Sequence, residues 1–275
     1  MSNALALSSA LLWGVAAFFG GQAARRTHLF SLLALDQALA AIFALPFALL
    51  LAEEFLVRDF LIGGLSGLFG SAGVAFFYLG LRTHMVSVAP ITGVVSALLP
   101  LLWGLGIGEQ LSLVQLLGTC LGLLSILLVS GQGFEKTKLR LDSIINGVLA
   151  GTGFGFGYIV LNSTTPATAP WPIFSARLVP AVLILLVATK APWPTKPSKD
   201  ARVLIAGASF SDVFAAVLFL AALNQGLLST SSVLSNIHPA VTVLLARLFL
   251  SERVSPNQGL GLVAAVTSIS MITIG

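Results

Sequence analysis

The sequence consists of ten apolar stretches separated by short, more polar segments. Each stretch is close to the roughly 20 residues that an α-helix needs to cross about 30 Å of hydrocarbon. The stretches are residues 3–22, 29–51, 60–81, 86–107, 113–129, 143–161, 172–189, 203–223, 229–250 and 257–274. A chain that is 57% hydrophobic and 9% charged lacks the polar surface of a soluble protein. We therefore predict an all-α integral membrane protein with ten transmembrane helices.

The first stretch begins almost directly after Met1 and has neither a basic segment nor an A-x-A cleavage site before its apolar run. We interpret it as a retained span rather than a signal peptide. Cys120, the single cysteine, lies in an apolar stretch, which excludes an internal disulfide and a cysteine-based metal site. We expect no metal and no cofactor. We interpret the basic charge balance as a property of the loops, so no nucleic-acid partner is expected.

A polar sequence pattern occurs twice, as GEQLSLVQLLG at residues 108–118 and as SERVSPNQGLG at residues 251–261. The two glutamates are 143 positions apart (252 − 109), and an offset of 141 relates Gly14 to Gly155 and Asp36 to Arg177 further upstream. The sequence therefore predicts two homologous five-helix halves, residues 1–130 and 143–275, joined by a polar linker at 131–142. Because five is odd, the second half must enter the membrane in the opposite sense. Such an inverted repeat is typical of secondary transporters.

The repeated pattern also has a local interpretation as helix capping. Ser and Gln three residues apart form a capping box at a helix start, and an acidic side chain is favourable near a helix N-terminus. We assign this structural role to the following residues: Glu109, Ser112, Gln115, Glu252, Ser255 and Gln258.

Several of these features together resemble the EamA family of the drug/metabolite transporter superfamily. The resemblance rests on Trp13-Gly14, Arg177, the LSERVS motif at residues 250–255, Pro239 thirteen residues before Glu252, and the duplication. It implies a basket of ten helices around a central cavity, with the fifth and tenth helices at the periphery. It also implies export of amino acids, other small metabolites or drugs.

Two positions depart from the pattern of that family. Asp36 stands where the family commonly carries a basic residue. Ser96 stands at the counterpart of Pro239, with Pro100 displaced by one helical turn.

Basic residues are distributed unevenly among the loops. The loops that follow even-numbered spans hold only Arg58. The loops that follow odd-numbered spans, which we call the odd-numbered loops, hold Arg25, Arg26, Arg82, Lys136, Lys138, Arg140, Lys190, Lys196, Lys199, Arg202 and Arg253. The positive-inside rule therefore places the odd-numbered loops in the cytoplasm and both termini outside it. Many relatives in the superfamily have the reverse orientation.

Three charged residues lie within apolar stretches, namely Asp36, Arg177 and Asp212. A charge near the bilayer centre costs on the order of 2.5–3.5 kcal/mol on insertion scales unless it is paired, hydrated or protonated. Asp212 is interpreted either as a ligand for an ammonium or a proton, or as the ion-pair partner of Arg177. Arg177 has a planar fork suited to a substrate carboxylate, with a helix-to-helix tie as the alternative. Asp36, about two turns from a helix end, is a candidate for proton coupling in a hydrated vestibule.

The ninth stretch carries a polar stripe, because Ser231, Ser235, His238 and Thr242 recur at helical spacing beside Pro239. Such a face points into a bundle or a cavity, and His238 is a candidate for titration during transport. The alternative interpretation of His238 is a structural one, in which the ring only makes local hydrogen bonds.

Mixed small, polar and aromatic faces on other helices predict further cavity-lining residues: Trp13, Tyr78, Ser96, Trp103 and Tyr158. Ordinary helix packing is the alternative for each. The glycine run GTGFGFG at residues 151–157 lacks the Gly-x-Gly-x-x-Gly spacing of nucleotide sites, and we interpret it as close helix packing.

These features predict a secondary-active transporter of a cell inner membrane. It would export small metabolites such as amino acids, with one half rocking against the other. Its partners are a small-molecule substrate and the lipid bilayer, and it is a monomer or a homodimer. The alternative is an exporter of organic cations or drugs coupled to protons. No Walker motif for ATP and no catalytic motif occurs, so an enzyme is not expected.

Overall fold

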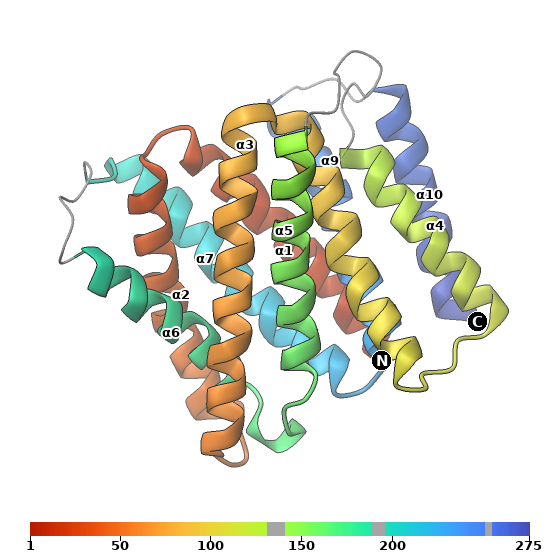
Figure 1. Cartoon of the computed structure of the whole chain (residues 1–275), viewed down its shortest axis with the longest axis horizontal. Helices are drawn as coiled ribbons and strands as arrows, with labels where there is room; N and C mark the ends of the chain where they lie inside the picture. Colours follow the sequence, from red (N-terminus) through yellow and green to blue (C-terminus); the bar gives the residue numbers. More distant parts are fainter. Residues whose placement is uncertain (131–140, 189–195, 251–254) are drawn as a thin grey trace.

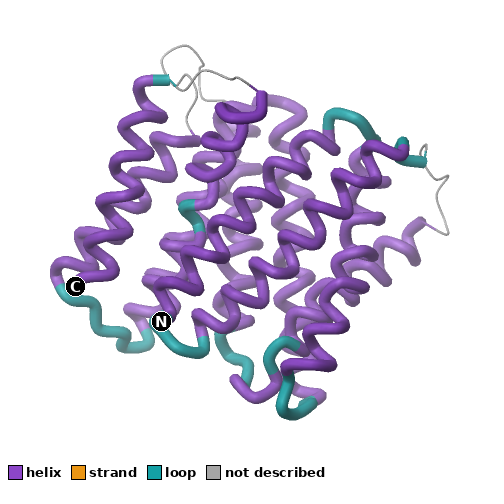
Figure 2. The backbone as a smooth tube through the Cα atoms, turned by 180° about the vertical axis from the view of Figure 1, so that it is seen from behind, coloured by secondary structure: helices purple, strands orange, loops and turns teal. Residues whose placement is uncertain are grey.

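The structure, a computed structural model, describes residues 1–130, 141–188, 196–250 and 255–275. Within these residues every regular element is a helix, and most of the loops lie at the two ends of the bundle (Figures 1 and 2). The helices are α1 (Ser2–Ala24), α2 (Leu29–Leu51), α3 (Val57–Gly106), α4 (Leu113–Ser130), α5 (Leu141–Leu161), η1 (Pro166–Thr168), α6 (Trp171–Ala188), α7 (Lys199–Leu223), α8 (Leu228–Ser235), α9 (His238–Leu250) and α10 (Pro256–Ile274).

The ten spans that the sequence predicts correspond to ten apolar helical segments within the described residues. Seven helical segments of the described residues are long and apolar enough to cross a membrane. Three shorter apolar segments complete the set: Ile91–Gly106, Leu113–Val129 and Trp171–Val187. The all-helical membrane fold is therefore confirmed.

Helix α3 differs from the sequence prediction, because its helical backbone continues through the expected loop between the third and fourth spans. Figure 1 shows that α3 rises, bends over at one end of the bundle and returns. We call residues 57–77 its first limb and residues 91–106 its second limb. The limbs run in opposite directions along α5, as four contacts show. The pairs are Ser66 with Gly157 and Gly73 with Gly153 for the first limb, and Val95 with Gly151 and Leu99 with Gly155 for the second.

Helix α5 lies between the two limbs of α3, and its glycines make this close packing possible. A Cβ on Gly151 or Gly155 would meet the second limb, and a Cβ on Gly153 would meet the backbone of the first. The glycine run at residues 151–157 is thus a packing surface, as its spacing predicts.

The predicted ninth span is divided into α8 and α9 at Asn236 and Ile237. Pro239 has no N–H to donate to the carbonyl of Ser235 four residues earlier, so the helical ladder is interrupted there. The ring of His238 occupies part of this gap, because its Nδ1 lies 3.3 Å from the Ser235 carbonyl oxygen. Since a carbonyl only accepts, Nδ1 must carry the hydrogen in this contact.

Helices α4 and α10 pack against each other along one flank of the bundle (Figure 1). Ser125 on α4 donates to the carbonyl of Gly261 at 2.9 Å, and Ser268 on α10 donates to the carbonyl of Gly118 at 2.7 Å. Gly118 near the start of α4 meets Ser268 near the end of α10, whereas the later Ser125 meets the earlier Gly261. The two helices therefore run antiparallel.

The remaining contacts interleave the two parts of the chain. Helix α1 packs against α7, α8 and α9, whereas α5 packs against α3. Helix α2 contacts α6 and α7, and α6 contacts α3. Both chain termini lie at the same end of the bundle, opposite the end at which α1 joins α2 (Figure 1).

Candidate functional site

The centre of the site is an ion pair between Arg177 on α6 and Asp212 on α7. Arg177 Nη2 lies 2.7 Å from Asp212 Oδ2, and Trp13 Nε1 on α1 donates to Asp212 Oδ1 at 3.0 Å. The Arg177 and Asp212 side chains are 21% and 26% exposed. Both carboxylate oxygens therefore have a protein donor, and both charged side chains keep part of their surface exposed.

Trp13, which bonds this carboxylate, belongs to a cluster of four aromatic rings. Trp13 stacks on Tyr158 at a centroid distance of 5.9 Å, and Phe219 lies 5.3 Å from Trp13 and 4.8 Å from Tyr158. The imidazole of His238 meets Trp13 edge-on at 6.3 Å. Helices α1, α5, α7 and α9 thus place an aromatic wall beside the ion pair, and this wall includes three of the residues that the sequence predicts.

A second carboxylate, Asp36 on α2, contacts the same helix as the ion pair. Ser209 on α7 donates to Asp36 Oδ1 at 2.6 Å, and Gln37 Nε2 donates to Asp36 Oδ2 at 3.4 Å. Ser209 precedes Asp212 by three residues, so both lie on one face of α7. Asp36 is therefore closer to the polar centre than a vestibule position at the end of α2 implies.

Other predicted lining residues make packing contacts away from the ion pair. Ser96 donates to Asn236 Oδ1 at 2.8 Å, and Ser235 donates to the carbonyl of Ala6 at 3.2 Å, both in buried surroundings. Trp103 is 50% exposed on the second limb of α3. The side chain of Tyr78 lies outside the described residues.

The capping residues behave in two ways. Ser112 with Gln115 and Ser255 with Gln258 form reciprocal capping boxes at the starts of α4 and α10. Glu109 reaches away from α4 instead.

The Glu109 carboxylate accepts hydrogen bonds from the N-terminus of α8. Leu228 N donates at 2.7 Å, Ser229 N donates at 3.0 Å, and the Ser229 hydroxyl donates as well. Because α8 lacks a side-chain cap of its own, Glu109 supplies one from the loop between α3 and α4. Glu252 lies outside the described residues.

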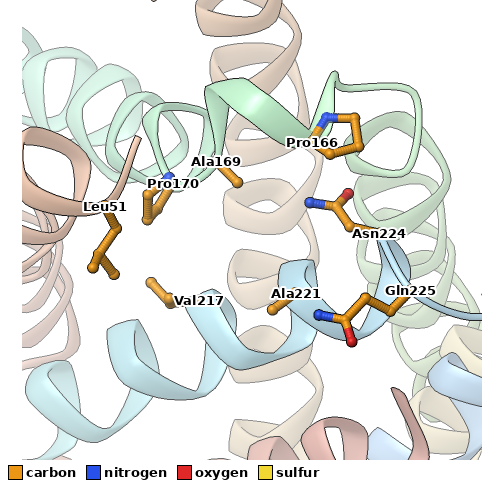
Figure 3. A pocket seen from close by; sticks show the side chains of 8 residues that line it. All are labelled: Leu51, Pro166, Ala169, Pro170, Val217, Ala221, Asn224 and Gln225. Atoms are coloured by element: carbon orange, nitrogen blue, oxygen red, sulfur yellow. The ribbon is translucent and has the colours of Figure 1, made fainter. Parts of the chain in front are cut away.

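A cavity of about 340 Å³ lies near the end of the bundle that carries the termini (Figure 3). It is lined by Leu51, Pro166, Ala169, Pro170, Val217, Ala221, Asn224 and Gln225. Because an α-helix turns by about 100° per residue, Val217 and Ala221 lie on the side of α7 opposite Asp212. This cavity contains none of the predicted binding residues and is separate from the ion pair.

Asp59 fixes the loop that forms part of this cavity. Its buried carboxylate accepts from Thr165 N at 2.7 Å and from the Thr168 hydroxyl at 2.8 Å, which holds η1 in place. Sequence reasoning did not assign Asp59 a role, because its partners lie more than a hundred residues away.

Phe219 contacts Trp13 and Ser209 contacts Asp36, and the sequence analysis did not single out either residue. They stand seven residues after and three residues before Asp212, so helical spacing alone would have placed them on its face. Asn236, the partner of Ser96, gave no such signal.

Comparison with known proteins agrees with this architecture. The model of the EamA-like transporter family matches residues 1–131 and again residues 142–274. No curated protein matches the chain. One solved crystal structure of a protein aligns over 99% of this chain and 98% of its own, with a TM-score of 0.83 and 16% identity, which supports the fold alone. Because the two family matches together span nearly the whole sequence, the chain belongs to the EamA-like transporter family of the drug/metabolite transporter superfamily.

Proposed function

We propose that this membrane transporter exports small zwitterionic metabolites, with amino acids as the substrate class, by alternating access. The observation that carries the proposal is the partly exposed ion pair between Arg177 and Asp212, 2.7 Å apart. A guanidinium fork matches a carboxylate, and a carboxylate matches an ammonium group. A zwitterion could therefore replace each partner of the pair with a group of the same charge.

This replacement limits the electrostatic cost of opening the pair. Separating two charges in a weakly polar bundle is unfavourable if either one is left without a partner. A bound amino acid keeps both partnered, because its carboxylate takes the place of Asp212 on Arg177 and its ammonium takes the place of Arg177 on Asp212. Trp13 and Tyr158 would then pack against the substrate side chain or its ammonium.

Reciprocal contacts support an inverted repeat of residues 1–130 and 143–275. Ser125 on α4 bonds to Gly261 on α10, and Ser268 on α10 bonds to Gly118 on α4. An offset of 143 converts each residue of α4 into the residue of α10 with the same role, since 125 + 143 = 268 and 118 + 143 = 261. Such exchange is expected where a twofold axis relates two halves. The antiparallel course of α4 and α10 agrees with halves that enter the membrane in opposite senses.

The interleaved packing modifies the expected mechanism. Because α1 packs with α7, α8 and α9, and α5 packs with α3, the two moving groups of helices would each contain one helix from the other half. Rocking of these two groups about the ion pair would expose it to one side of the membrane and then to the other.

The distribution of Lys and Arg favours an inner-membrane orientation with both termini outside the cytoplasm. The ends of α1 and α10 that carry the termini lie at the same end of the bundle, which this orientation and its reverse both require (Figure 1).

Export of organic cations coupled to protons is the competing function. It would need Asp212 to act alone on a cation, whereas here Arg177 contacts Asp212 directly. The ion pair therefore favours a zwitterion over a simple cation.

Counterflow into proteoliposomes tests the proposal. Vesicles with the wild type, Asp212→Asn or Arg177→Gln would be preloaded with mixed amino acids or, separately, with organic cations. We expect amino-acid counterflow in the wild type and its loss in both variants. Cation flux lost only in Asp212→Asn would support the competing function, and absence of both fluxes would contradict both.

A further inference from the structure

The polar centre of the bundle contains more negative than positive formal charge. Asp36 and Asp212 contribute two carboxylates, whereas Arg177 contributes one guanidinium, so the three groups sum to −1 when ionised. Arg177 pairs with Asp212. The donors that reach Asp36 from the described residues, Ser209 and Gln37, are both neutral.

Asp36 is bonded to the same face of α7 that carries Asp212, through Ser209. Its partner Ser209 stands three residues before Asp212 on α7, a spacing that puts side chains about 5–6 Å apart at Cβ. Asp36 also interacts electrostatically with both Asp212 and Arg177. Helix α2 contacts both α6 and α7, which explains how three helices bring the three charges together.

Asp36 has an unsatisfied acceptor beside it. The amide of Gln37 lies beside the Asp36 carboxylate, and its Oε1 is buried without a hydrogen-bond partner. Asp36 itself is partly exposed. An ammonium group has three donors and no acceptor, so it could satisfy both the carboxylate and this amide oxygen.

We infer that the transported substrate carries a second cationic group, which Asp36 binds, so that the preferred class is the diamino carboxylates such as ornithine and lysine. The inference rests on the proposed function. Arg177 receives the carboxylate, Asp212 the α-ammonium and Asp36 the side-chain ammonium. A substrate of net charge +1 neutralises the site, whereas a neutral amino acid leaves Asp36 without a countercharge and an acidic one adds repulsion.

The rival occupant of Asp36 is a proton. A protonated Asp36 would neutralise the same excess charge and would favour neutral amino acids. Asp36 is bonded to Ser209 of α7 and to Gln37 of its own helix, and the charges that act on it are those of Asp212 on α7 and Arg177 on α6. The two occupants predict opposite substrate preferences, which makes them separable by measurement.

The experiment compares counterflow of labelled L-ornithine, L-lysine and L-leucine by the full chain in proteoliposomes. The variants are Asp36→Asn and Asp36→Glu, with Glu54→Gln, an exposed loop position, as the matched control that also removes one carboxylate. We expect the wild type and Glu54→Gln to prefer ornithine and lysine over leucine at least tenfold. Asp36→Asn should lose at least tenfold in ornithine and lysine flux and keep its leucine flux, while Asp36→Glu keeps the preference.

Three outcomes would overturn the inference. Leucine flux in the wild type equal to or above lysine flux would leave the proposed function standing and assign Asp36 to a proton. An equal loss of all three substrates in a folded Asp36→Asn would remove Asp36 as a specificity determinant. Absence of all flux in the wild type would contradict the proposed function as well. If Asp36→Asn fails to fold, Ser209→Ala decides, because removing the hydroxyl that positions Asp36 should reduce the preference several-fold.

Discussion

Ser268 donates a 2.7 Å hydrogen bond to the carbonyl of Gly118, at a point where a Cβ on the glycine would collide with Met271 and Ile272. The same arrangement recurs 143 positions later at Gly261, whose missing Cβ leaves room for Leu128 and Val129. The flank formed by α4 and α10 therefore depends on two backbone surfaces that approach closely.

Replacement of Gly261 should separate this flank. In Gly261→Ala the new methyl group meets the backbone nitrogen of Val129, and we expect a loss of about 1–3 kcal/mol of stability from overpacking. Gly259→Ala is the matched control, because nothing lies within 4 Å of its Cβ position, and the better helix propensity of alanine should leave it equal or up to about 1 kcal/mol more stable. Thermal unfolding in detergent measures both. Equal midpoints would contradict the packing argument.

Two tryptophans that the sequence analysis grouped together should behave differently in transport. Trp13→Phe keeps an aromatic ring but loses the indole N–H that donates to Asp212. Because hydrogen bonds to charged groups contribute about 1.5–3 kcal/mol, we expect a fall in counterflow of about tenfold or more. Trp103→Phe, at an exposed position, should leave counterflow within about twofold of the wild type. A larger effect at Trp103 than at Trp13 would reverse the assignment of the site.

Glu109 should matter for stability although it lies outside the polar centre. Glu109→Ala removes the acceptor for Leu228 N and Ser229 N, and we expect a loss of about 1–2 kcal/mol, as for other helix caps. Glu109→Gln, which keeps one acceptor oxygen, should lose less. Thermal midpoints of both variants, with exposed Glu54→Ala as the control, test the cap. A midpoint unchanged in Glu109→Ala would argue against it.

A topology reporter tests the membrane orientation. An enzyme that is active only outside the cytoplasm, fused after Gly275, should be active if the Lys and Arg bias sets the topology. A fusion of the same reporter after Asp142 should be silent. The reverse pattern would place both termini in the cytoplasm.

The number and type of the helices could be predicted from the sequence because hydrocarbon thickness fixes both their length and their polarity. The boundaries between helices were harder. The turn within α3 retains helical backbone, and the break between α8 and α9 falls at Asn236, whereas Pro239 is the residue that signals it. A proline acts on the carbonyl four residues earlier, so the visible change lies upstream of the residue that causes it.

The candidate site could be predicted in part. Arg177 and Asp212 stood out because the bilayer does not tolerate unpaired charges. The partner of Glu109 could not be found in the same way. Its own sequence surroundings indicate a cap on the next helix, and only tertiary packing brings the N-terminus of α8 nearer.

The position of α5 between the limbs of α3 has a consequence for biosynthesis. Residues 57–106 are synthesised before α5, so the surface of α3 that packs on α5 is at first without its partner helix. The packing partners of α1, which are α7, α8 and α9, are synthesised later still. A nascent chain that ends at residue 130 therefore has two helix faces, on α1 and α3, whose packing partners have not yet been synthesised. The earliest helices to be translated reach their final neighbours only when the latest ones arrive.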